Sequence, residues 1–118
     1  MDKAKDYGID YERGVANCVG SEEFYEKILS MFLNDTSFAR AKAAYEARDY
    51  AAMFSCMHEL KGVSGNAALV GLYNAAIPLV EILRNGNADD AEVDKYFAAV
   101  EAGYNLTVEG VGVIIARE

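Results

Sequence analysis

Apolar residues recur every three or four positions along most of this chain, and that spacing restricts the fold more than any other feature. Phe24, Ile28 and Phe32 follow one another at intervals of four residues, which is the repeat of an amphipathic helix. No Asn-Gly or Asp-Gly hairpin turn stands between two alternating apolar runs, so strand signals are weak. The pattern therefore predicts helices that pack against one another.

Residues suited to helix ends divide the chain. Asp10, Ser21 and Asp49 each precede an apolar-periodic segment, where a side-chain oxygen accepts a hydrogen bond from a free N–H of the first turn. The expected helices cover approximately residues 10–18, 21–33, 38–48, 50–69, 70–85 and 89–104. Pro78 predicts a kink within its helix, and Gly86 predicts a turn with positive φ.

The length of 118 residues favours one domain, spanning 1–118, with a core at roughly 8–104. Residues 105–118 are interpreted as a helix extension or a tail. Val108, Val111 and Ile115 keep a helical spacing, but the two glycines there leave a disordered or exchanged tail open. The expected fold is all-α: an up-down four-helix bundle with a short extra N-terminal helix.

The charge balance narrows the classes of partner. With 11 Lys and Arg against 19 Asp and Glu, the net charge is −8, which argues against binding to nucleic acid or to an anionic membrane. No apolar run approaches the roughly 18 residues of a membrane helix. Cys18 and Cys56 are interpreted as free thiols in a reducing compartment, and the N-terminus does not resemble a signal peptide. A cytoplasmic location is expected.

The stretch HELKGVSGN, residues 58–66, contains the only histidine of the chain. On a helical wheel, one side holds apolar residues and is predicted to face the core: Met53, Cys56, Leu60, Val63 and Ala67. The opposite side holds His58 and its expected neighbours: Ala51, Phe54, Ser55, Lys61, Gly62, Gly65 and Leu69. His58 is therefore expected to project away from the core, on an open and convex helix face.

Two glycines beside His58 need an explanation, because each costs a helix up to about 1 kcal/mol relative to alanine. Gly62 and Gly65 either make room for another helix of the same chain or let a second molecule approach the His58 ring. Lys61, about one turn from His58, supplies a positive charge that suits an anion such as phosphate.

The chemistry open to His58 is limited by its neighbours. No second histidine and no cysteine on this face offers a metal site, and Ser55 lacks an evident oxyanion hole for hydrolysis. An unprotonated imidazole is itself a nucleophile near neutral pH, since its ordinary pKa is about 6.5. Of these reactions, phosphorylation of the ring therefore needs the fewest additional groups from this chain.

These residues resemble the histidine-containing phosphotransfer (HPt) family. The match follows the pattern H-x-L-K-G-x-S-G-N from His58 to Asn66, continues with Leu72, and extends more weakly over residues 8–100. Ala68 stands where the family often has glycine. Pro78 and the long C-terminal segment are further departures.

The resemblance implies a phosphorelay intermediate, not an enzyme. His58 would accept a phosphoryl group from an aspartate of a receiver domain and pass it to another receiver aspartate. Lys61 would offset phosphate charge, and docking would involve Gly62, Gly65, Phe54 and Ser55. The implied partners are response-regulator receivers and a hybrid histidine kinase. No cofactor is expected on this chain, because Mg²⁺ would belong to the receiver, and a monomer is expected. A helical adaptor without chemistry, or an enzyme using His58 as a base, remain as alternatives.

Overall fold

The computed structural model describes residues 2–116, and within that range every regular element is a helix. The elements are η1, a 3-10 helix (Asp2–Tyr7), and the α-helices α1 (Tyr11–Asn17), α2 (Glu22–Phe32), α3 (Ser37–Glu46), α4 (Tyr50–Asn66), α5 (Val70–Arg84) and α6 (Asp90–Ala116). The all-α prediction is confirmed.

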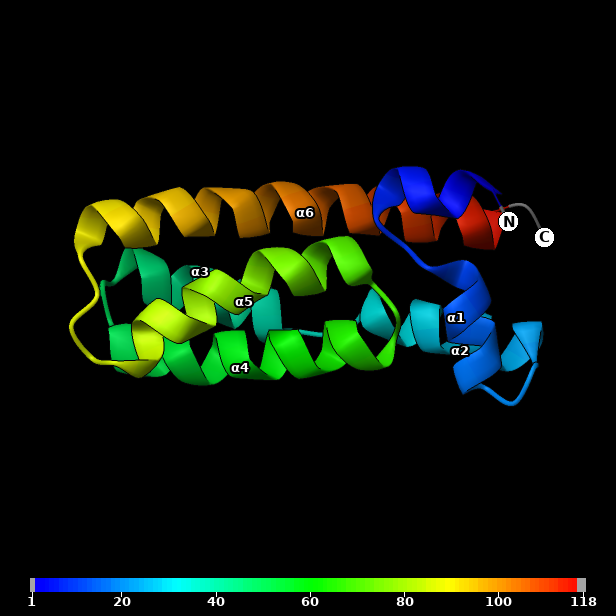
Figure 1. The fold of residues 1–118 in the computed structure, drawn as a ribbon, viewed down its shortest axis with the longest axis horizontal. Coiled ribbons are helices and arrows are strands. Elements are labelled where there is room, and N and C mark those ends of the chain that lie inside the picture. The colour runs from blue at the N-terminus through cyan, green and yellow to red at the C-terminus, as the bar shows by residue number, and fades with distance from the viewer. Residues whose placement is uncertain (1, 117–118) are drawn as a thin grey trace.

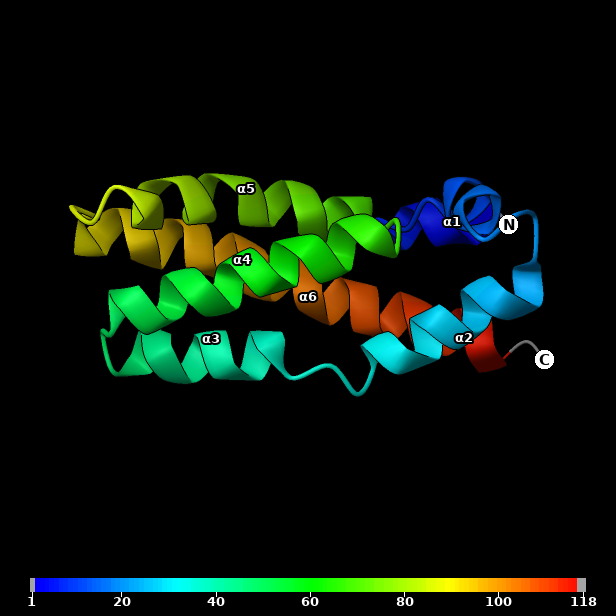
Figure 2. The same ribbon diagram turned by 90° about the horizontal axis from the view of Figure 1, so that it is seen from below.

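The long helices lie side by side in an elongated molecule of 44 × 22 × 20 Å (Figure 1). α4 lies between α3 and α5, and α6 runs along the side of the bundle opposite α4 (Figure 2). Stacked rings join α3 to α6: Phe38 lies 4.1 Å from Tyr104, and Tyr45 lies 4.2 Å from Phe97, between ring centroids. α3, α4, α5 and α6 therefore surround a common core.

The residues that the helical wheel predicts to face the core are buried or half-buried in the structure. Met53, Cys56 and Leu60 are buried, and so is Ala67, just past the helix end, while Val63 is half-buried. Their burial drives α4 into the core, since each buried apolar side chain contributes about 1.5–3 kcal/mol relative to exposure. His58 therefore lies on the exposed side of α4.

The predicted helix starts are confirmed. The side chain of Asp10 accepts a hydrogen bond from the Arg13 N–H, that of Ser21 from Phe24, and that of Asp49 from Ala52, at 3.0–3.1 Å. Gly86 has φ 74°, as the expected turn requires. α5 continues as one helix through Pro78.

The end of α4 differs from the prediction, which extended this helix to about Leu69. α4 ends at Asn66, because Ala68 adopts φ 57° and the Leu69 N–H donates back to the Ser64 carbonyl. This is the Schellman arrangement of a helix end. Leu69 is consequently buried at 0% exposure, and its predicted place beside His58 is wrong.

The segment 105–116 continues α6 as a regular helix; 117–118 lie outside the described range. Val111 and Ile114 are buried against η1 and α2, and the Tyr7 side chain covers Gly110. η1 itself was not predicted.

Two further expectations concern the thiols and the membrane. Cys18 and Cys56 form no disulfide in the described chain, with Cys56 buried and Cys18 half-buried. Between residues 2 and 116, no helix combines the length and hydropathy needed to cross a lipid bilayer.

Candidate functional site

His58 lies on the exposed side of α4, with one neighbouring ring against it. The Phe54 ring, one turn earlier, is parallel to the imidazole within 7°, with centroids 6.0 Å apart. The guanidinium carbon of Arg84, from the end of α5, lies 5.4 Å from the Phe54 ring centroid. Phe54 is thus half-buried between the imidazole and α5, and its contact with the ring favours one orientation of His58.

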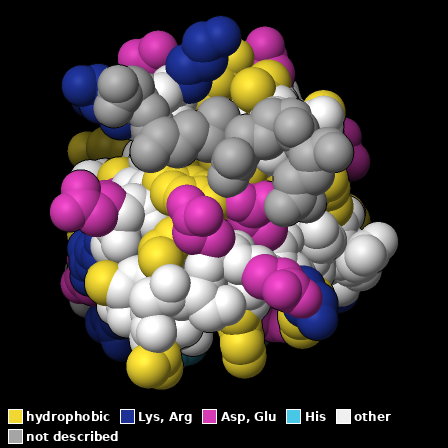
Figure 3. Space-filling view, turned by 90° about the vertical axis from the view of Figure 1, so that its right-hand side faces the viewer, with side chains coloured by type: hydrophobic (Ala, Val, Ile, Leu, Met, Phe, Trp, Pro, Cys, Tyr) yellow, Lys and Arg dark blue, Asp and Glu magenta, His cyan; other side chains and the backbone are white. Residues whose placement is uncertain are grey.

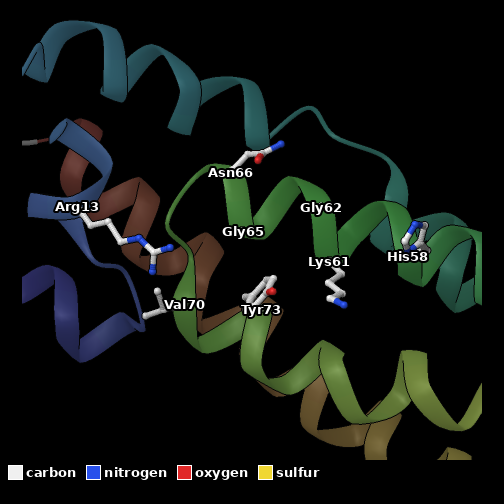
Figure 4. A pocket seen from close by; sticks show the side chains of 8 residues that line it. All are labelled: Arg13, His58, Lys61, Gly62, Gly65, Asn66, Val70 and Tyr73. Carbon is white, nitrogen blue, oxygen red and sulfur yellow. The ribbon is translucent and has the colours of Figure 1, made fainter. Parts of the chain in front are cut away.

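A hollow of about 410 Å³ opens beside His58, between α4, α5 and α1 (Figure 4). Its lining residues are Arg13, His58, Lys61, Gly62, Gly65, Asn66, Val70 and Tyr73. The prediction of a convex helix face is therefore wrong. The two glycines lower the floor of the hollow, and the neighbouring helices form its sides.

The two glycines of the motif have different surroundings. A methyl group placed on Gly62 would meet no atom within 4 Å, so this position is open. A methyl group on Gly65 would come within 3.0 Å of Cε1 of Tyr73 on α5. Packing within the chain therefore accounts for Gly65, whereas nothing in the described chain packs on Gly62.

The charges of the hollow are positive. Lys61 projects into it from α4, and Arg13 projects from α1 at the end farther from His58 (Figure 4). None of the eight described lining residues is Asp or Glu. This composition suits anions, because a carboxylate or phosphate at either end of the hollow meets a cation and, among the described lining residues, no like charge.

Two other motif residues, Ser64 and Asn66, do not point into the hollow. Ser64 is fully buried, and its hydroxyl donates a 3.0 Å hydrogen bond to the Lys61 carbonyl oxygen. The Asn66 side chain points away from the hollow, toward α2 (Figure 4). Ser64 therefore has a structural role beside the site.

The position of α1, and with it Arg13, follows from contacts with the end of α4. The Asp10 N–H donates to the Ala68 carbonyl at 3.0 Å, and the Tyr25 hydroxyl donates to the Ala67 carbonyl at 2.7 Å. Burial raises the pKa of that Tyr25 hydroxyl above its ordinary value, so it stays a donor across the physiological range. α1 is held on top of Tyr25 at Gly14, where a methyl group would clash with the ring at 2.1 Å.

A second, more apolar hollow lies on the other side of the end of α4. It has a volume of about 320 Å³ and is lined by Ile28, Met31, Phe32, Asn34, Asp35, Val63, Asn66 and Ala67. Asn66 therefore lines both hollows. Met31 is 69% exposed and Phe24, further along α2, is 58% exposed, which are large values for apolar side chains.

The predicted site residues separate into two groups. His58, Lys61, Gly62 and Gly65 meet in one hollow, and Phe54 contacts the His58 ring. Ser55 is exposed but does not line the hollow. Arg13, Val70 and Tyr73 were not predicted, because they come from α1 and α5 and no local pattern marks them as neighbours of His58. Only the packing of three helices brings these residues together.

Neither a metal-binding cluster nor a similarity to known proteins indicates what this site does. In the described part of the chain, no group of three or more His, Cys, Asp or Glu side chains is arranged to hold a metal ion. Comparisons with models of known protein families, with curated proteins and with solved structures find no match to this chain.

Proposed function

We propose that this protein is a phosphorelay intermediate of the histidine-containing phosphotransfer type. In that function, the lone pair of an unprotonated His58 ring nitrogen forms a P–N bond while the P–O bond to a receiver aspartate breaks. The reverse exchange delivers the group to the aspartate of a second receiver. The supporting observation is that the only histidine is exposed beside a hollow whose described lining includes two cations, no carboxylate and an open glycine.

The proposal includes a fold assignment. The chain is a single domain in which α2 and α3 form one side of an up-down four-helix bundle, with α4, α5 and α6 as the other three sides and α1 as the short extra helix. The arrangement of α3 to α6 around one core supports it. We further propose that the protein acts as a monomer in the cytoplasm.

The residues of the site then have separate roles. Lys61 offsets the charge of the phosphoryl group, Gly62 leaves space for the receiver, and Phe54 supports the imidazole ring. Gly65 and Ser55 remain proposed docking positions, on the floor of the hollow and on the adjoining face of α4. Magnesium and the acid–base groups belong to the receiver, and the chain transfers phosphate without kinase activity of its own.

A helical adaptor without chemistry is the second candidate. The exposed apolar side chains of Phe24 and Met31 favour a protein partner in either case. The two functions differ at His58, because an adaptor has no need of a nucleophile. An enzyme using His58 as a base is less favoured, since the described lining offers His58 no carboxylate, serine or cysteine as a catalytic partner.

Labelling by receivers tests the proposal. The chain is incubated with radiolabelled phospho-receivers from the same genome, and the label is expected to be acid-labile and base-stable. His58→Gln should abolish labelling and retain the helical circular dichroism of the wild type. Lys95→Gln, at an exposed position on α6 that has no proposed role in docking, should label normally. Acid-labile phosphate on the His58→Gln variant, or no labelling of the wild type by any receiver, would contradict the proposal.

A further inference from the structure

We infer that Arg13 is a docking residue that contacts a carboxylate at the acidic rim of the receiver domain and speeds its association. This inference rests on the proposed function and names a contact on its partner. Arg13 lies at the end of the hollow farther from His58, with Gly62 and Gly65 between them along α4 (Figure 4). A partner that places its reacting aspartate at His58 would extend along the floor toward α1.

The charge distribution of the whole chain makes such a contact useful. The net charge is −8, and acidic side chains are prominent on the end of the molecule where α1 and α2 lie (Figure 3). The net charge therefore repels an acidic partner at long range. The hollow is different, because among its described lining residues only Arg13 and Lys61 carry a fixed charge.

The partner is acidic for a chemical reason. A receiver that carries phosphate on an aspartate must hold Mg²⁺ against it, and proteins bind Mg²⁺ with carboxylates near the phosphoryl oxygens. The rim of that active site therefore presents several carboxylates close to the reacting atom. Lys61 is near enough to His58 to meet the phosphoryl group, which leaves Arg13 for a carboxylate farther out.

Arg13 is also free to make this contact and is held in place. Within residues 3–116 the Arg13 guanidinium forms no salt bridge, whereas the guanidinium groups of Arg40 and Arg48 are paired with Glu59 and Asp94. Its helix is fixed to the end of α4 by the Asp10 N–H to Ala68 carbonyl bond. The backbone of Arg13 is therefore fixed beside the hollow, and its exposed guanidinium is available to a partner.

A charge at the rim of an interface changes the association rate more than the chemical step. The test uses the receiver that labels the wild-type chain fastest, made fluorescent, and measures association by stopped flow at low and at physiological ionic strength. Arg13→Glu should lower the association rate constant about tenfold at low ionic strength and less at physiological salt. The transfer rate in the preformed complex should stay unchanged.

Lys95→Glu is the matched control, because it makes the same charge change at an exposed position on α6, on the opposite side of the molecule from α4. It should alter association by less than about twofold. Equal effects of the two variants, or a slower transfer step in the Arg13→Glu complex, would overturn the inference and leave the proposed function standing. A wild-type chain that no receiver labels would overturn both.

Discussion

At the scale of single residues, the two glycines of the motif differ although the sequence presents them as a pair. Gly62 is exposed and has open space around it, whereas Gly65 lies against the Tyr73 ring. The helix loses stability at both positions, but the chain gains packing space only at Gly65. The loss of helix stability at Gly62 therefore has no compensation within the described chain, and a docking partner would explain it.

This difference predicts that the two positions respond differently to alanine. Gly62→Ala should raise the free energy of unfolding by up to about 1 kcal/mol, because it removes the helix penalty of glycine without a clash. Gly65→Ala should raise it by less or lower it, because the Tyr73 ring must shift. Urea unfolding of both variants measures this. A loss of stability in Gly62→Ala would show that this face of α4 is not open. The proposal that Gly62 leaves space for the receiver would then lose its support.

At the scale of elements, three helices end in the same way without the residue that usually marks such an end. Val19, Arg48 and Ala68 have φ of 54–57° after α1, α3 and α4. In each case the next N–H donates back to a carbonyl five residues earlier, namely Val15, Ala44 and Ser64. Left-handed geometry costs a residue with a Cβ about 1–2 kcal/mol, so each turn stores strain.

Val19 offers the clearest test, because its side chain is 97% exposed and contributes no packing. Val19→Gly should raise the free energy of unfolding by about 1 kcal/mol by relieving the left-handed strain. Val19→Ala is the control. Because alanine keeps a Cβ, this variant should raise the free energy of unfolding clearly less than Val19→Gly does. Thermal and urea unfolding compare the two. If alanine stabilises as much as glycine, β-branching and not the left-handed φ is the source of strain.

The same elements show which parts of the fold were predictable. Helix starts could be predicted because Asp10, Ser21 and Asp49 carry an oxygen that caps a helix wherever it occurs. The end of α4 could not, because Ala68 does not signal a left-handed turn as glycine would. His58, Lys61 and Gly62 were found because they share one helix face. Arg13 and Tyr73 were not, because their place in the hollow depends on tertiary packing.

At the scale of the whole molecule, α6 connects the core to the end that carries α1. Its first half packs against α3 and α5, and its last turns cover η1 and α2. η1 and the following residues are in turn bound to α5, since the Gly71 N–H donates to the Gly8 carbonyl at 2.9 Å. The positions of α1 and Arg13 beside the hollow therefore depend on residues that are distant in sequence from HELKGVSGN.

The last turns of α6 should accordingly unfold together with the rest of the protein. Ile114 is 1% exposed and its neighbour Val113 is 36% exposed, which makes them a matched pair. Ile114→Ala should lower the free energy of unfolding by about 2–5 kcal/mol through lost burial and a new cavity. Val113→Ala should change it by less than about 1 kcal/mol. Urea unfolding measures both, and hydrogen exchange of the amides of 106–116 should give the same opening free energy as those of α4. A small effect of Ile114→Ala with fast exchange in this segment would mean that the end of α6 opens independently, and the bundle would then hold α1 in place without it.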